Sequence, residues 1–413
     1  MKVLMLGSWD SGGGAAIAAN RLCNAMIKYG IDASLFVEKK KTDADYVCVL
    51  PKKKLYYLHA AGREMENRLI RKLTKTTNKI LHTVNCVTVS DISWINDSDY
   101  DVVHLHWING TVSTSDIAKI NKPIVWTLHD SWPCCGAEHH PNLIENDTRW
   151  KDGYTKDNKP DTTKGVDICK KVWEQKRRLL KDKNIIFVAP SDWERDILKK
   201  SALFGDSECF VIPNPLPYSI FHTHDKMNER RLRGIPTDKM VIGFGAANQM
   251  DSPDSMKGTS YLIEALNRLG KKDRCFILLF GPAQDGFTRH LPVPFYSSGY
   301  TSDPDEMACL YSCCDCFVNS SLIENLSNTV FESIACHTPV TAFDVGGTSD
   351  LVTHKFNGYL AKPYDPDDLT RGIEFCLENN KSLSDNCAEL SEKITEKHIV
   401  EDYLKVYSLA LKS

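Results

Sequence analysis

Short, almost entirely apolar runs alternate along the chain with longer stretches in which apolar residues recur at helical spacing. Runs this apolar, bounded by Gly, Pro, Asp or His, are typical of parallel strands that are covered on both faces. The predicted strands are residues 1–6, 102–105, 124–128, 185–189, 241–244, 276–280, 316–318 and 340–343, and the clearest predicted helices are residues 15–29, 260–269 and 367–377. The alternation predicts an α/β fold with parallel sheets.

The pattern is interrupted at residues 212–239, where a proline-rich IPNPLP and a basic NERRLRGIPTDK separate two strand–helix series. We therefore predict two doubly wound domains, over residues 1–215 and 216–384. A last helix, over residues 385–413, follows the second sheet and can pack back on the first domain.

Composition and charge mainly exclude classes of protein. The 413 residues are 42% hydrophobic and 25% charged, as in globular proteins, and a net charge of −3 gives no general attraction to nucleic acid. No apolar run reaches the roughly 18–20 residues of a membrane span, and MKVLMLGSWDSGGG indicates a strand entering a glycine loop rather than a signal peptide. The 15 cysteines are scattered and odd in number, which argues against a disulfide framework and favours the cytoplasm.

Ligands of open α/β sheets bind beyond the carboxyl ends of the strands, so the loops there hold the candidate chemistry. The first such loop contains Gly13 and Gly14 at the start of a helix, where glycines permit close approach and backbone amides attract anions. It lacks the G-x-G-x-x-G pattern and the acidic partner of a dinucleotide site. A tight strand–helix turn is the alternative.

Histidines follow two further strands of the first half. His129 and Asp130 come directly after the strand at 124–128, where a histidine can reach a ligand. His104 and His106 alternate in VVHLHW, so we expect them to point to opposite faces and only one of them to line the cleft. A purely structural histidine is the alternative at each position.

In the second half, Lys257 and Gly258 open a helix, and a lysine there adds its charge to the positive end of the helix dipole. Phosphate is the natural partner, and a solvated lysine is the alternative.

The strongest pattern in the chain is SSLIENLSNTVFES, with Glu324 in a loop and Glu332 inside the following helix. The backbone amides of Asn325, Leu326 and Ser327 are available at the helix start for an anion or a hydroxyl. Carboxylates accept hydrogen bonds from sugar hydroxyls but bind phosphate poorly. Amides between two carboxylates therefore suit a nucleotide sugar, in which sugar, diphosphate and ribose follow one another. The alternative is that neither glutamate binds a ligand: Glu324 is then an ordinary acid at the helix N-terminus, and Glu332 a solvated acid of the helix.

With these residues the sequence resembles the retaining glycosyltransferases of family 4, whose signature is Glu, seven residues, Glu, and then a small-residue helix and Pro-Val. Similar segments run through most of the chain: DVVHLHW, PIVWTLHDSWP, VAPSDWERD, VIPNPL, MKGTSYLIEAL, GYTSDPDEMACLYSCCDCFVNSS and FNGYLAKPYDPDDL. The chain looks closest to members that build bacterial capsular or exopolysaccharide repeat units on a lipid carrier.

The resemblance implies the GT-B fold, two Rossmann-like domains facing across a cleft, and a hexose moved from a nucleotide-diphosphate sugar to a saccharide. It implies the following roles: Glu324 and the amides of Asn325, Leu326 and Ser327 at the donor sugar or diphosphate, Glu332 at the ribose, Lys257 at the departing diphosphate, His129 near the reaction centre, Gly13 and Gly14 approaching donor and acceptor, and His106, Asp130 and Trp132 on the acceptor side.

The family retains the anomeric configuration without an established covalent nucleophile, and front-face attack is the usual proposal. It implies no cofactor and no divalent metal, with UDP slightly favoured over GDP as the donor's nucleotide. Two departures stand out. The loop after residue 245 lacks the family's arginine, so phosphate binding relies more on Lys257, and His337 replaces the glycine that ends the Glu helix. Histidine tolerates the left-handed geometry needed there.

Close relatives also carry a cysteine cluster after TLHD-x-WP. In this chain the corresponding residues are Cys134, Cys135, His139, His140 and Cys169, whose spacing is irregular for zinc, and an acceptor-side loop is favoured over a zinc site.

Residues 52–79 hold nine Lys or Arg interleaved with Leu, Ile and Tyr. We expect this face to meet anionic lipid, which would place the protein at the inner face of the plasma membrane beside a lipid-linked acceptor. A solvated amphipathic helix packed on the first sheet is the alternative.

Three other functions stay open: a nucleotide-sugar-binding protein without turnover, an epimerase and a phosphorylase of the same architecture. The extra carboxylates of an epimerase and the cofactor lysine of a phosphorylase do not stand out. The sequence does not identify the donor sugar, its base, the acceptor or the linkage.

Overall fold

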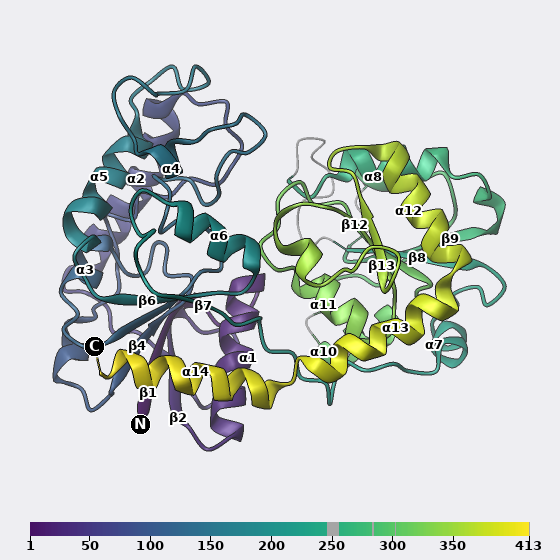
Figure 1. The fold of residues 1–413 in the computed structure, drawn as a ribbon, viewed down its shortest axis with the longest axis horizontal. Coiled ribbons are helices and arrows are strands. Elements are labelled where there is room, and N and C mark those ends of the chain that lie inside the picture. The colour runs from purple at the N-terminus through teal and green to yellow at the C-terminus, as the bar shows by residue number, and fades with distance from the viewer. Residues whose placement is uncertain (246–255, 283–284, 302, 413) are drawn as a thin grey trace. The chain divides into compact units, whose positions relative to one another are not determined.

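The computed structural model describes residues 1–245, 256–282, 285–301 and 303–412, which form two compact units (Figure 1). The first unit comprises Met1–Pro215 and Lys397–Ser413, and the second comprises Leu216–Glu396. Each unit has its own parallel sheet and apolar core.

The described part of the first unit contains a seven-stranded sheet in the order β3-β2-β1-β4-β5-β6-β7. Its strands are β1 (Lys2–Trp9), β2 (Asp32–Lys39), β3 (Val47–Val49), β4 (Val102–Leu105), β5 (Ile124–Thr127), β6 (Ile185–Ala189) and β7 (Cys209–Val211). Its helices are α1 (Gly14–Lys28), α2 (Tyr56–Thr74), α3 (Thr114–Ala118), α4 (Arg149–Asp152), α5 (Ile168–Leu180), α6 (Asp192–Lys200) and α14 (Glu396–Ala410), with a 3₁₀ turn at Ser93–Asp97. Polar caps start several helices; for example, Ser191 accepts a hydrogen bond from the Glu194 amide at the start of α6.

The described part of the second unit contains a six-stranded sheet in the order β10-β9-β8-β11-β12-β13. Its strands are β8 (Met240–Gly245), β9 (Cys275–Phe280), β10 (Phe295–Ser297), β11 (Cys316–Asn319), β12 (Val340–Phe343) and β13 (Gly358–Ala361). Its helices are α7 (Lys226–Arg233), α8 (Thr259–Arg268), α9 (Asp285–Thr288), α10 (Pro304–Ser312), α11 (Asn328–Ala335), α12 (Pro366–Glu378) and α13 (Asn380–Lys393), with 3₁₀ turns at Lys272–Arg274 and Gly346–Asp350.

All strands of each sheet are parallel, but the strand order runs outward in two opposite directions from one central pair. This pair is β1 and β4 in the first unit and β8 and β11 in the second. Leu6 is paired with Leu105 in the first central pair, and Phe244 with Val318 in the second. Crevices outside the carboxyl ends of such strands are where doubly wound sheets bind ligands. The loops after these four strands therefore contribute to the two candidate sites.

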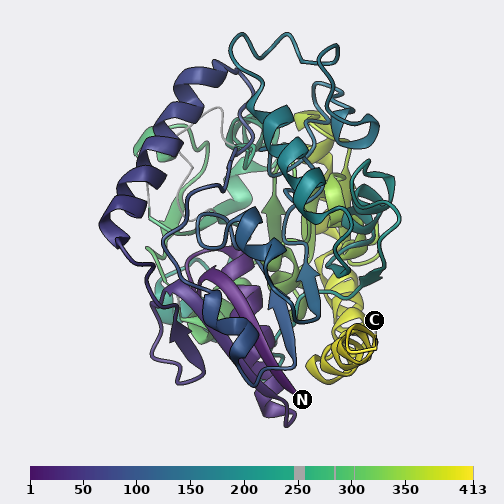
Figure 2. The ribbon, with the colours of Figure 1, turned by 90° about the vertical axis from the view of Figure 1, so that its left-hand side faces the viewer.

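In place of the single last helix expected over 385–413, the structure has α13 in the second unit and α14 against the first (Figures 1 and 2). Tyr403 and Tyr407 of α14 are buried. The Tyr407 hydroxyl lies 2.7 Å from Nδ1 of His104, and the Tyr403 hydroxyl lies 3.0 Å from Oγ1 of Thr127. The C-terminal helix therefore closes the core of the first unit. No helix in the described ranges combines the length and apolarity needed to cross a membrane.

Asp315, just before β11, holds a buried cluster of positive charge in the second unit. Its carboxylate accepts hydrogen bonds from Lys226 Nζ at 2.8 Å, Arg230 Nη2 at 2.7 Å and the Val241 amide at 2.8 Å. Burial alone raises the pKa of Asp315, but Lys226 and Arg230 hold the pKa below its ordinary value. Because Arg230 is 1% exposed, this carboxylate is the main compensation for a charge removed from water.

We expect Asp315→Asn to destabilise the protein by about 3–5 kcal/mol, since a buried guanidinium loses its charged partner. Urea unfolding measures the loss, with Asp238→Asn at an exposed position as the control. A lowered carboxyl pKa stabilises the fold above the unfolded-state pKa of about 3.9 and loses this effect as the pH falls. The gap between wild type and variant should therefore narrow in acid. Equal stability at neutral pH would contradict this role.

Candidate functional site

The second unit brings Lys257 and Glu324 together beyond the carboxyl ends of β8 and β11. Nζ of Lys257 lies 3.2 Å from Oε2 of Glu324 and 3.4 Å from the Ser321 hydroxyl. The Lys257 side chain is 45% exposed and that of Glu324 is 18% exposed. A cation and a carboxylate are thus paired where solvent, or a ligand, still reaches both.

Two glycines with left-handed backbone lock the loops that carry this pair. Gly258 has φ +64°, and a Cβ there would lie 1.9 Å from the Ser320 carbonyl oxygen. Gly346 has φ +59°, and its Cβ would lie 1.6 Å from the carbonyl oxygen of Glu324. The Gly347 amide also donates to that Glu324 oxygen at 3.2 Å. No side chain fits at either contact, so glycine is required at both for conformation and space.

Helix α11 begins directly after these loops and presents its N-terminus near Glu324. Asn325, Leu326 and Ser327 are each at most 8% exposed. Ser327 occupies the cap position, but its side chain makes no capping hydrogen bond to the helix and instead accepts one from Asn319 Nδ2 at 3.0 Å. The helix start therefore keeps the positive dipole end that favours an anion. At the other end His337 has φ +57°, which confirms the predicted left-handed stop.

Glu332 occupies the second turn of α11 and is 6% exposed. Its Oε2 accepts a hydrogen bond from the Tyr311 hydroxyl of α10 at 2.9 Å. The two glutamates of the sequence motif thus have different settings: Glu324 is paired with a lysine at the surface, and Glu332 is oriented by a buried tyrosine. Sequence reasoning did not identify Tyr311. The predicted absence of an arginine after residue 245 concerns residues 246–251, which lie outside the described part of the chain.

In the first unit, Nδ1 of His106 lies 2.9 Å from Nε2 of His129. The rings of His104 and His106 are 4.1 Å apart between centroids. The prediction that His104 and His106 point to opposite faces is therefore wrong, because side chains two positions apart on a strand share a face. Burial lowers the pKa of His129 to about 4 and that of His104 to about 3, so these rings are neutral near neutral pH.

Asp130 is the hydrogen-bonding centre of this unit's loop. Its Oδ2 accepts from Trp107 Nε1 at 2.7 Å and lies 2.6 Å from Nδ1 of His139, and its Oδ1 accepts from the Trp132 amide at 3.0 Å. Burial alone raises the pKa of Asp130, but His139 and the hydrogen bonds hold it at about 2. Trp132 is fully buried and donates from its indole to the Thr83 carbonyl at 2.9 Å.

A small cavity of about 10 Å³ lies beside these histidines, room for about one water. Its lining includes His106, His129, Asp130, Trp126 and Trp132. Nε2 of His106 is buried there and has no hydrogen-bonding partner in the structure. The three residues assigned to the acceptor side, His106, Asp130 and Trp132, therefore lie together. Trp132 is the least exposed of the three.

The glycine loop after β1 is open to solvent at Gly13 and Gly14. A Cβ built on Gly13 meets nothing within 4 Å, and its φ of −173° suits any residue. Gly12, with φ +88°, is the glycine that the turn itself needs. Gly13 is thus not required by the turn, which leaves close approach of a ligand as a reason for it.

The five residues considered for zinc do not form one cluster in the structure. Cys134 and Cys135 are fully buried in the apolar core, and His139 is bound to Asp130. Among the described residues, the group of three whose ligand atoms come close is His82, Glu138 and Cys169. Only Cys169 belongs to both sets.

The sequence of the chain is similar to those of known glycosyltransferases. The family model described as "Glycosyl transferases group 1" matches residues 249–396, which include Lys257 and both glutamates. The second unit belongs to the group 1 glycosyltransferase family. Over 398 residues the chain is 24% identical to a D-inositol 3-phosphate glycosyltransferase of Corynebacterium aurimucosum, covering 91% of this chain and 85% of that protein. Over 163 residues it is 28% identical to the N,N'-diacetylbacillosaminyl-diphospho-undecaprenol alpha-1,3-N-acetylgalactosaminyltransferase of Campylobacter jejuni, covering 38% and 43%.

Solved glycosyltransferase structures share the fold along the whole chain. Anabaena Alr3699/HepE superposes with a TM-score of 0.65 at 16% identity, covering 99% of each chain. WaaG, a glycosyltransferase of lipopolysaccharide biosynthesis, superposes with a TM-score of 0.64 at 13% identity, covering 98% of this chain and 99% of its own. The predicted α/β fold of the GT-B type, with two doubly wound Rossmann-like domains, is confirmed.

Since burial lowers the pKa of His129 to about 4, its ring should stay neutral between about pH 5.5 and 8, where an ordinary histidine of pKa about 6.5 titrates. NMR of the protein with isotope-labelled histidine rings measures the titration midpoint of His129, and the His129→Asn variant identifies its signal. A His129 midpoint above about pH 6 would contradict the burial found here.

Proposed function

We propose that the glycosyltransferase moves a hexose from a nucleotide-diphosphate sugar to a saccharide with retention of the anomeric configuration. The observation that carries the proposal is the Lys257–Glu324 pair, 3.2 Å apart beside the start of α11. Such a half-exposed ion pair contributes little to stability, so its partners are easily exchanged for those of a ligand. A diphosphate takes the lysine, and the hydroxyls of the donor sugar take the carboxylate.

Glu332 supplies the third contact of the proposed donor site. Tyr311 donates to one of its oxygens, and we propose that the carboxylate, held in this way, accepts hydrogen bonds from the two ribose hydroxyls. The backbone amides of residues 325–327 lie in sequence between the two carboxylates, as the diphosphate lies between hexose and ribose. This order supports a nucleotide sugar over a simple sugar phosphate.

The transfer step needs positive charge where the diphosphate leaves. In the proposed front-face reaction the bond from the anomeric carbon to the diphosphate oxygen breaks. The bond to the acceptor oxygen forms on the same face, and the departing phosphate oxygen takes the acceptor's proton. Lys257 and the dipole of α11 stabilise the charge that develops on the leaving group. We propose that no divalent metal or cofactor is required for this step.

A UDP-hexose is the proposed donor. Anabaena Alr3699/HepE, whose fold this chain shares, was crystallised with UDP-glucose. Glu332 would hold any ribose and Glu324 the hydroxyls of several hexoses, so the base and the sugar are the parts of the donor that the experiment must identify.

The proposed acceptor is a lipid-linked saccharide used in surface polysaccharide synthesis. The Campylobacter relative is named for an acceptor on diphospho-undecaprenol. In the first unit α2 has an exposed apolar stripe, made of Leu58, Met65, Leu69 and Leu73, each at least 42% exposed and spaced to share one helix face. Lys72 and Lys75 lie next to it in exposed positions. We propose that this stripe contacts anionic lipid at the inner face of the plasma membrane.

Some of the basic residues in 52–79 form ion pairs with acidic residues of the same unit. Lys53 pairs with Asp116 at 2.9 Å, and Arg63 pairs with Glu38 at 2.6 Å. The attraction to lipid therefore rests on fewer charges than the nine counted from sequence, and the apolar stripe must supply much of the binding energy.

We expect one class among UDP-, GDP-, ADP- and dTDP-sugars to bind and to be slowly hydrolysed in the presence of EDTA. Glu332→Ala should weaken binding by roughly 10–100-fold, since it removes hydrogen bonds to a charged group. Calorimetry measures the affinity, with Glu378→Ala, whose side chain is 61% exposed, as the control. If the variant binds as wild type does, the ribose assignment is wrong. Binding without turnover, with any acceptor tested, would favour a nucleotide-sugar-binding protein.

We expect the protein to sediment with anionic vesicles and to be released as salt rises, since screening weakens the electrostatic share. Replacing Leu58, Met65 and Leu69 together by Gln should abolish sedimentation. Leu232→Gln, at a position 70% exposed in the second unit, is the control. Absence from anionic vesicles at every salt concentration would exclude this membrane surface.

A further inference from the structure

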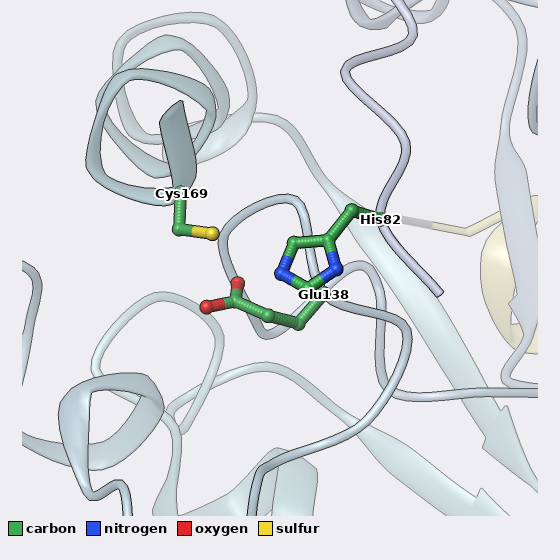
Figure 3. A group of neighbouring side chains, drawn as sticks. All are labelled: His82, Glu138 and Cys169. Atoms are coloured by element: carbon green, nitrogen blue, oxygen red, sulfur yellow. The ribbon is translucent and has the colours of Figure 1, made fainter. Parts of the chain in front are cut away.

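Three side chains of the first unit with metal-ligating chemistry converge outside the sites described above (Figure 3). His82 lies on the segment after α2, Glu138 on the segment after β5, and Cys169 in the first turn of α5. One ligand atom from each, the imidazole nitrogen, a carboxylate oxygen and the thiol sulfur, lies within 4.8 Å of the others.

The backbone holds His82 and Glu138 opposite one another. The two residues form an antiparallel bridge, flanked by hydrogen bonds from the Thr83 amide to the Ala137 carbonyl at 2.8 Å and from the His139 amide to the Leu81 carbonyl at 2.9 Å. This is the non-hydrogen-bonded type of pair, in which the side chains lie closest. The convergence is therefore fixed by the main chain and not by side-chain rotation alone.

The orientation of the imidazole suits a ligand. Nδ1 of His82 lies 2.6 Å from the carbonyl oxygen of Ile80, which can only accept a hydrogen bond. Nδ1 therefore carries the proton, and Nε2 presents its lone pair. A carbonyl that fixes the tautomer in this way is the usual outer partner of a metal-bound histidine.

The charge around the group is unbalanced. Arg149, whose side chain is 5% exposed, contacts Glu138 at 3.0 Å, Asp147 at 2.8 Å and Asp167 at 3.4 Å. One guanidinium thus faces three carboxylates, each with a side chain no more than 14% exposed. A divalent cation beside Glu138 would offset the excess negative charge, whereas a second basic side chain is not provided there by the described contacts.

We propose that His82, Glu138 and Cys169 bind one Zn²⁺, with water in the fourth position. Bonds of about 2.0–2.3 Å to nitrogen, oxygen and sulfur place tetrahedral ligand atoms roughly 3.5 Å apart, so small side-chain rotations close the site from the present separations. A thiol and an imidazole select zinc over calcium or magnesium, which take oxygen ligands. On binding, the Cys169 thiol releases its proton to solvent and the sulfur coordinates as thiolate.

Zinc here would cross-link three chain segments, of which the two around His82 and Glu138 already share backbone hydrogen bonds. Glu138 precedes His139, whose ring holds Asp130, so the metal would stiffen the loop that carries Asp130 and His129. This role is structural and is independent of the proposed sugar transfer.

The test is Zn²⁺ binding by the full chain after removal of metal with EDTA, followed by competition with a chromogenic chelator. We expect one equivalent to bind, and Co²⁺ in its place to give a thiolate charge-transfer absorption. Cys169→Ser should lose the Co²⁺ absorption and bind Zn²⁺ at least ~100-fold more weakly, above the range typical of losing an outer partner. Cys86→Ser, which removes an exposed thiol of the same unit, should bind as wild type does.

His82→Gln is the second variant, because it changes a half-buried side chain and leaves the α5 core intact. It should also bind at least ~100-fold more weakly, with unchanged circular dichroism of the metal-free protein. The proposal is overturned if the wild type binds less than one equivalent, or if the two ligand variants bind as tightly as Cys86→Ser.

Discussion

The second unit depends on main-chain contacts that no side chain could make. Gly258 approaches the Ser320 carbonyl and Gly346 approaches that of Glu324, so the loops after β8, β11 and β12 are interlocked. These contacts place Lys257 beside Glu324 at the central strand pair of the sheet, and α11 starts from the same loop. The charges and the helix dipole are thereby positioned before any ligand arrives, which is what electrostatic catalysis requires.

In the first unit, the loop after β5 is held instead by hydrogen bonds to a buried carboxylate, that of Asp130. The Asp130 carboxylate accepts hydrogen bonds from the Trp107 indole and the Trp132 amide and contacts the His139 ring. A neutral His106–His129 pair lies beside it. Such a network stays rigid as long as every member is satisfied. Nε2 of His106, which is buried without a hydrogen-bonding partner, adjoins the small cavity and marks where the network is incomplete.

The sequence predicted the inner strands well because fully buried parallel strands leave continuous apolar runs, and each of the eight predicted runs is a strand. It missed the short edge strands β3, β7, β10 and β13 and also β2, the strand next to an edge, whose buried and partly exposed positions alternate and whose composition is mixed. The Glu324–Glu332 motif and Lys257 were identified because they follow inner strands. Tyr311 and the His82–Glu138 bridge were not, since their partners come from segments whose sequence spacing carries no signal.

Whether Lys257 binds the diphosphate of the donor can be measured by comparing a nucleoside diphosphate with the corresponding monophosphate. Calorimetry of UDP and UMP, or of the nucleotide class that binds, gives the contribution of the second phosphate in wild type and in Lys257→Gln. Wild type should prefer the diphosphate, and the variant should lose most of this preference while binding the monophosphate nearly as before. An unchanged preference in Lys257→Gln would show that Lys257 does not bind the diphosphate.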